Sequence, residues 1–175
     1  DDIRDFQIEG MSIGDSALDY YSKKEIDNFK KASYYKDSGF TTFDNIKLPN
    51  QETFEFLTFS IKTNDKKYII VHIGGDIDYL DNIKDCYSKK DEIVKEMSEL
   101  FNNSEKKDLG TFSHNYDKTG DSKVSMFGFY LKTGLANVSC YDWSKKLNAQ
   151  GFPDSLRVVM LTRKFNKWLE MKAYK

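Results

Sequence analysis

The sequence predicts an α+β fold in which helices pack on an antiparallel β-sheet, with elements in the order, roughly, α-α-β-β-α-β-β-β-α. Stretches in which apolar residues alternate predict the sheet, and they come in two pairs: 54–61 with 68–73, and 124–131 with 135–143. Only a few residues separate the members of each pair, as in an antiparallel hairpin. The strict alternation of strands and helices that builds a parallel sheet is absent. A chain of 175 residues fits one domain, so we expect a single α+β domain over residues 1–175.

Two short helices are expected near the N-terminus. Ser12-x-x-Asp15 and Ser22-x-x-Glu25 both have the spacing of a capping box. In that motif the serine accepts a hydrogen bond from an amide of the first turn, and the acid reaches back to the amide that precedes the helix. Apolar residues then follow each box at helical spacing.

The strongest amphipathic pattern predicts a long helix over residues 83–101. Its apolar residues recur every three or four positions, with a break at Lys90. Ser88-x-x-Asp91 has capping-box spacing too, so Ser88 is an alternative start for this helix. The strand 68–73 precedes the helix, and we interpret Gly74-Gly75 as the corner between them.

The remaining segments divide into two predicted elements and two predicted loops. Residues 156–161 form a strand and residues 163–174 a closing helix. Residues 34–50 are aromatic but not periodic, with a turn at Pro49-Asn50, and residues 103–122 are polar. Both of these stretches are expected to be irregular.

Composition excludes some function classes. The chain has 27 basic and 28 acidic residues and a net charge of −1, whereas a general nucleic-acid binder has a basic excess, so we expect no nucleic acid as a partner. No apolar run is long enough to span a membrane, so no transmembrane segment is expected. The chain begins DDIRDF, which we interpret as a mature form after removal of a signal peptide, or as a trimmed chain.

The two cysteines predict a disulfide between Cys86 and Cys140. Cys86 lies on the apolar face of the long helix, and Cys140 shares a strand face with Val138. A bond between them would stabilise the fold by roughly 4 kcal/mol in the chain-entropy model. It would also imply an oxidising compartment, so we expect a periplasmic or extracellular location. Two separate buried thiols are the alternative.

A short stretch near the N-terminus suggests chemistry. Gly14-Asp15-Ser16-Ala17-Leu18 resembles the nucleophile block of the GDSL esterase/lipase family. The resemblance implies a hydrolase in which Ser16 attacks an ester with the help of a histidine near the C-terminus. The only histidines here are His72 and His114, and the terminal Asp-x-x-His of that family is absent. The other interpretation makes Asp15 and Ser16 first-turn residues of a capped helix.

A second candidate site surrounds the two adjacent glycines. His72, Asp76 and Asp78 lie close together there, as in an oxyanion turn or a metal site. The alternative is a strand corner with solvated acids. No spacing typical of a metal or cofactor site occurs, so we expect no cofactor.

Two further features bear on function. Trp143 and Trp168 either pack in the core or form an aromatic binding surface. The Lys/Asn/Asp/Ile-rich composition, the start at Gly10-Met11-Ser12 and the two cysteines resemble uncharacterised exported proteins of AT-rich bacteria. The same start resembles the first helix of small periplasmic α+β binding domains of the inhibitor-protein/BamE type. We predict a non-catalytic exported domain that binds another protein or a small ligand, and the alternative is a small hydrolase that uses Ser16.

Overall fold

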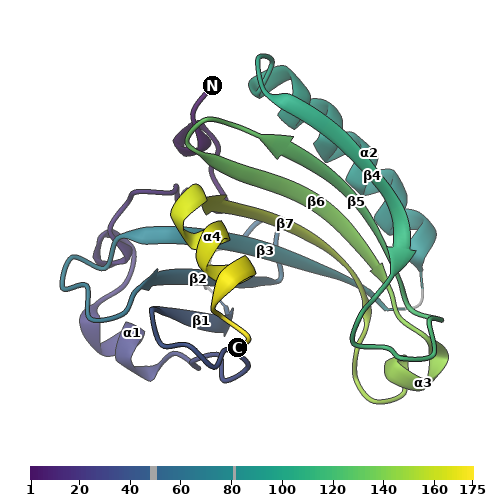
Figure 1. The fold of residues 1–175 in the computed structure, drawn as a ribbon, viewed down its shortest axis with the longest axis horizontal. Coiled ribbons are helices and arrows are strands. Elements are labelled where there is room, and N and C mark those ends of the chain that lie inside the picture. Colours follow the sequence, from purple (N-terminus) through teal and green to yellow (C-terminus); the bar gives the residue numbers. More distant parts are fainter. Residues whose placement is uncertain (48–50, 81) are drawn as a thin grey trace.

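Seven strands form one antiparallel sheet in the order β1-β2-β3-β7-β6-β5-β4 (Figure 1). The computed structural model describes all residues except 48–50 and 81. The strands are β1 (Phe40–Ile46), β2 (Phe56–Lys62), β3 (Ile70–Leu80), β4 (Glu105–Ser113), β5 (Lys123–Tyr130), β6 (Gly134–Asp142) and β7 (Asp154–Thr162). The last strand, β7, returns to the centre and pairs with both β3 and β6. The predicted fold class, helices packed on an antiparallel sheet, is confirmed.

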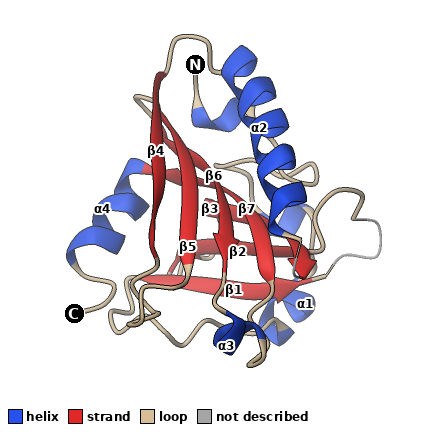
Figure 2. Cartoon of the chain, turned by 90° about the vertical axis from the view of Figure 1, so that its right-hand side faces the viewer, coloured by secondary structure: helices blue, strands red, loops and turns tan. Residues whose placement is uncertain are grey.

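Two helices lie on opposite sides of this sheet (Figure 2). The long helix α2 (Ile83–Leu100) packs on β3, β6 and β7, and α4 (Arg163–Met171) contacts β6 and β7. The shorter elements are α1 (Lys23–Asn28), α3 (Lys145–Asn148) and the 3-10 turns Ile3–Asp5 and Ala17–Asp19. Among the described residues, no helix combines the length and the apolar character needed to cross a membrane.

The face under α2, here called the α2 face, carries the main core. Alternate residues of the strands point to the same side, and those on the α2 face are almost fully buried: Leu57, Phe59, Ile73, Val138, Leu156, Val158 and Met160. A disulfide between Cys86 and Cys140, with the sulfurs 1.99 Å apart, ties α2 to β6 within this core. The predicted pairing of the two cysteines is therefore confirmed.

The break in the apolar pattern of α2 has a structural role. Lys90 is buried, and its Nζ donates a hydrogen bond to Ser125 Oγ at 2.8 Å. The helix begins at Ile83, not at Ser88, so the alternative start is wrong. The Ser88 hydroxyl instead donates to the carbonyl oxygen of Lys84 within the helix, at 3.2 Å.

Only the second of the two N-terminal helices forms. The Ser22–Glu25 capping box is present and begins α1, as predicted. At Ser12 the amide donates to the Asp15 carboxylate, but the following residues form a turn, because the Gly14 amide donates to the carbonyl oxygen of Ile70. Bonds to the start of β3 thus replace the expected helical bonds, and the prediction of a helix from Ser12 is wrong.

Three further predictions of local structure need correction or fall outside the structure. β3 runs through Gly74 and Gly75 to Leu80, so the corner at these glycines is wrong. The segments predicted as loops contain β1 and β4. β1 escapes the pattern because its pairing shifts between Phe43 and Ile46, and β4 because all nine of its residues are exposed. The turn predicted at Pro49-Asn50 lies outside the described residues.

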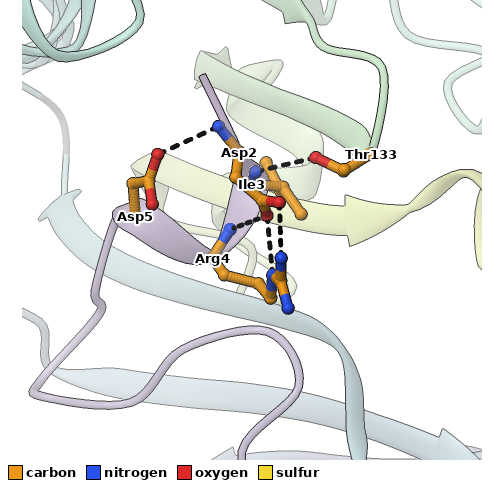
Figure 3. Close-up of polar contacts among 5 residues, drawn as sticks. All are labelled: Asp2, Ile3, Arg4, Asp5 and Thr133. Carbon is orange, nitrogen blue, oxygen red and sulfur yellow. Dashed lines mark hydrogen bonds and ion pairs between the residues drawn. The ribbon is translucent and has the colours of Figure 1, made fainter.

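The first residues are held against the β5–β6 turn (Figure 3). The Ile3 amide donates to Thr133 Oγ1 at 2.9 Å, and the Arg4 guanidinium donates to both carboxylate oxygens of Asp2 at 2.9 and 2.7 Å. These bonds from Arg4 lower the pKa of Asp2 to about 2. The N-terminal segment is therefore part of the folded structure.

Candidate functional site

The face of the sheet under α4, here called the α4 face, gathers the polar candidates. His72, Asp76 and Asp78 occupy alternate positions of β3 and thus share this face. Across β7 they are paired with Leu161, Arg157 and Ser155. The structure therefore brings the three candidates to one face, along a continuous strand and not around a turn.

His72 lies at the end of this face that α4 covers. Its ring stacks on Phe165, with centroids 5.0 Å apart and an interplanar angle of 8°. Its Nδ1 and Ser60 Oγ are 2.8 Å apart, and Ser60 is fully buried. Burial, with the neighbouring Arg157, lowers the pKa of His72 to about 3. His72 is therefore a neutral packing group at ordinary pH, and its serine partner is out of reach of a substrate.

An ion pair occupies the middle of the α4 face. Arg157 Nε and Nη2 donate to Asp76 Oδ1 and Oδ2 at 2.5 and 3.2 Å. The guanidinium also lies 5.4 Å from the centroid of the Tyr141 ring. Partial desolvation opposes the charge of Arg157, whose side chain is still 47% exposed, but Asp76 and Tyr141 outweigh it and raise the pKa of the guanidinium. Arg157 therefore stays charged, held between a carboxylate and an aromatic ring.

Beyond this pair the α4 face is hollowed. The larger hollow has a volume of about 840 Å³, and its polar lining residues include Asp76, Asp78, Ser155 and Arg157. A smaller hollow of about 260 Å³ adjoins it, contains His72, and shares Asp76 and Arg157 with it. We call the two together the groove. Aromatic residues form much of the wall of the larger hollow: Tyr34, Phe56, Tyr116, Tyr141, Trp143, Phe152 and Tyr174.

The aromatic wall at one end is a connected cluster. The Trp143 ring lies 4.6 Å from His114 and 5.2 Å from Phe152, centroid to centroid, and Tyr116 lies 5.6 Å from Phe152. His114 Nδ1 accepts a hydrogen bond from the Tyr116 amide at 3.1 Å, and burial lowers the pKa of His114. The wall is thus preformed. Trp143 lines the groove, which fits the interpretation as a binding surface.

The second tryptophan has the other role. Trp168 lies on the buried side of α4, and its indole nitrogen donates to Asp37 at 2.5 Å. It therefore packs in the small core between α4 and the sheet.

Asp78 is the acid of the groove whose negative charge is least offset by nearby bases. Among the described residues, no hydrogen bond or ion pair engages its carboxylate. Burial, Glu55 and Asp76 raise the pKa of Asp78, and Lys47 and Arg157 offset them only in part. The groove therefore contains one carboxylate that lies near other acids and has no direct partner.

Sequence reasoning missed two polar groups of the groove, Ser155 and Arg157. Both alternate with the buried residues Leu156 and Val158 of β7. A polar residue at every second position of an apolar strand was the available signal. Such alternation assigns both residues to one face, but it does not identify the partner strand.

Ser16 does not form the nucleophile–base pair of a hydrolase. Its Oγ donates to the carbonyl oxygen of Lys67 at 2.7 Å and accepts the Leu18 amide at 3.2 Å. His72 and His114 are bonded to other groups. Ser16 thus acts as the N-cap of the 3-10 turn Ala17–Asp19.

Within the described part of the chain, no three His, Cys, Asp or Glu side chains converge in a way that would hold a metal ion. The groove is therefore interpreted from its own chemistry. No family model, curated protein or solved structure matches this chain.

Proposed function

We propose that this chain is a non-catalytic binding domain that takes a small ligand, or a segment of a partner protein, in the groove of the α4 face. The larger hollow carries the proposal. Its volume of about 840 Å³ lies within the range of ligand sites, about 300–1,000 Å³. Ligand sites also combine apolar and aromatic walls with a few polar groups that fix orientation, as Asp78 and Arg157 do here.

The proposal includes export to a periplasm or to the cell exterior. The Cys86–Cys140 disulfide supports this location, because disulfides persist in oxidising compartments and are rare in the cytosol of most organisms. Both cysteines are fully buried, which favours a structural role for the bond over a redox-active one.

Fragment binding observed by NMR tests the proposal. A mixed set of small aromatic, sugar, cationic and anionic fragments is screened by saturation transfer, and binding is mapped on the ¹⁵N–¹H spectrum. We expect shifts at the amides of Asp78, Tyr141 and Arg157. Trp143→Ala should weaken binding, because it removes part of the aromatic wall.

Leu109→Ala is the matched control. Leu109 lies on β4 with 43% of its surface exposed, and it lines neither hollow of the groove. The variant should bind as the unaltered protein does. Fragments that bind only outside the groove, or no binding by any fragment, would contradict the proposal.

A further inference from the structure

We infer that the groove binds a guanidinium, or a similarly delocalised organic cation, above Ser155 and between Asp78 and Tyr141. The inference rests on the proposed binding function and adds the chemical class of the ligand. Three observations carry it: the register of the strands, the side chain at one position of β7, and the charge balance around Asp78.

Two neighbouring rows of the sheet each have an aspartate on β3 and differ in the residues that β7 and β6 place beside it. In the first row Asp76 of β3 is paired with Arg157 of β7. The Arg157 guanidinium fills the space between the Asp76 carboxylate and the Tyr141 ring. The groove thus already holds one guanidinium, supplied by its own chain.

In the next row a small residue takes the place of the arginine. Asp78 is paired with Ser155, and Ser155 is paired with Tyr141 of β6. Neighbouring strands are about 4.8 Å apart, so the β3 and β6 backbones lie roughly 10 Å apart. The short Ser155 side chain leaves the space between them open, and all three residues line the larger hollow. The second row therefore has a carboxylate without a cation, and its ring, Tyr141, is the same ring that the Arg157 guanidinium of the first row approaches.

The charges around Asp78 favour a cation as the ligand above Ser155. The acids near it are Asp76 and Glu55, and the bases are Arg157 and Lys47. Arg157 is already paired with Asp76, and Lys47 Nζ lies over the Phe56 ring, 4.6 Å from its centroid. An anionic ligand at this point would meet the Asp78 carboxylate directly. A cation would pair with it.

The ring beside Asp78 selects the kind of cation. A guanidinium is planar and weakly hydrated, stacks on aromatic faces and matches a carboxylate with two parallel hydrogen bonds. Asp78 and Tyr141 lie on either side of Ser155 in the strand register and would offer these two contacts to a guanidinium above it. A compact ammonium ion would lose more hydration on entering such a site.

A pair of nearly isosteric probes tests the charge requirement. Nα-acetyl-arginine amide and Nα-acetyl-citrulline amide are titrated into the protein at low ionic strength and followed on the ¹⁵N–¹H spectrum. We expect the arginine probe to bind at least about tenfold more tightly, with shifts at Asp78, Ser155 and Tyr141. Equal affinity for the two probes would overturn the inference.

Two variants should reduce binding for different reasons. Asp78→Asn removes the charge and should weaken arginine binding by about tenfold or more. Ser155→Arg places a guanidinium from the chain itself in the open position and should abolish binding. Asp91→Asn, on an exposed position of α2, is the matched control and should change nothing. The melting temperature of each variant shows whether it is folded, and unchanged binding by both folded groove variants would overturn the inference.

The source of the guanidinium is a separate question with its own probe. A pentapeptide with a central arginine between glycines is compared with the acetylated amino-acid amide. Tighter binding of the peptide would support a polypeptide segment as the ligand, and equal binding would support a small free cation. If neutral fragments enter the groove while the arginine probes do not, this inference fails and the proposed function stands; if nothing enters it, both fail.

Discussion

Phe54 packs its ring directly on the backbone of Gly75. A Cβ built on Gly75 would lie 2.5 Å from two atoms of that ring, closer than real Cβ atoms approach any neighbour. Phe54 is itself buried, with 8% of its surface exposed. The glycine is therefore needed for packing.

Gly75→Ala should lower the free energy of unfolding by about 1–3 kcal/mol, because the added methyl group displaces the Phe54 ring. Gly74→Ala is the matched control on the same strand: its Cβ would meet no atom closer than 3.5 Å, an ordinary contact. Urea unfolding of the two variants measures the difference. Equal stabilities would contradict the packing argument.

The same two glycines show what the sequence could and could not predict. The sequence grouped His72, Asp76 and Asp78 around a predicted corner at Gly74-Gly75. They share one face only because β3 continues through the glycines and its residues alternate between the two faces. Gly75 is required because the Phe54 ring, from the segment before β2, packs on it. No local sequence pattern encodes that contact. For the same reason the pairing of Asp76 with Arg157 was not predictable: it depends on the register between β3 and β7.

The missed strands have different physical reasons. β4 is an edge strand whose nine residues are all exposed, so it has no buried face to produce an apolar alternation. Its stability comes from the ladder with β5. The turn at Ser12 shows the opposite error: its capping spacing is real, but bonds to β3 replace the helix.

Removal of the disulfide should cost about 4 kcal/mol, because the bond closes a loop between positions 54 apart and restricts the unfolded chain. The double variant Cys86→Ala, Cys140→Ala is compared with the unaltered protein by guanidinium unfolding. The unaltered protein unfolded in reductant is the control and should approach the variant. Two free thiols in the denatured, unreduced protein would contradict the bond.

The buried Lys90–Ser125 pair should show strong coupling. Ser125→Ala leaves the Lys90 ammonium without its hydroxyl acceptor and should cost about 1.5–3 kcal/mol. Lys90→Met removes the buried charge and keeps most of the volume, so it should cost less or stabilise the fold. In the double variant, Ser125→Ala should add little to Lys90→Met. A double-mutant cycle from urea unfolding measures this coupling, and additive costs would show that the hydrogen bond contributes nothing.

Ser16→Ala should affect stability and not hydrolysis. The Ser16 hydroxyl caps the 3-10 turn and donates to Lys67, so its loss should cost about 1 kcal/mol. Hydrolysis of p-nitrophenyl acetate by the variant should equal that of the unaltered protein. A loss of ester hydrolysis in Ser16→Ala would restore the hydrolase hypothesis. His114→Ala is the second test and shows whether that histidine takes part.

Asp78→Asn should stabilise the fold at neutral pH, although it removes a group that we assign to ligand binding. Burial and the acids Glu55 and Asp76 raise the pKa of Asp78, against the smaller effects of Lys47 and Arg157. A carboxyl group whose pKa is raised in the folded state binds its proton more tightly there than in the unfolded chain. Its ionisation therefore costs stability as the pH rises through the ordinary carboxyl range to the raised pKa, and the cost persists above it.

Asp78→Asn should raise the free energy of unfolding at about pH 7. The increase should be below about 1 kcal/mol, because solvent screens the partly exposed carboxylate, and it should be absent at about pH 3. Asp117→Asn is the control of opposite sign: bonds from Ser122 and Thr119 lower the pKa of Asp117, so that variant should lose stability at neutral pH and lose less as the pH falls. Urea unfolding at several pH values measures both. If Asp78→Asn were destabilising at neutral pH, Asp78 would already have a stabilising partner in the fold, and the second row would lack the unpaired charge that a cation needs.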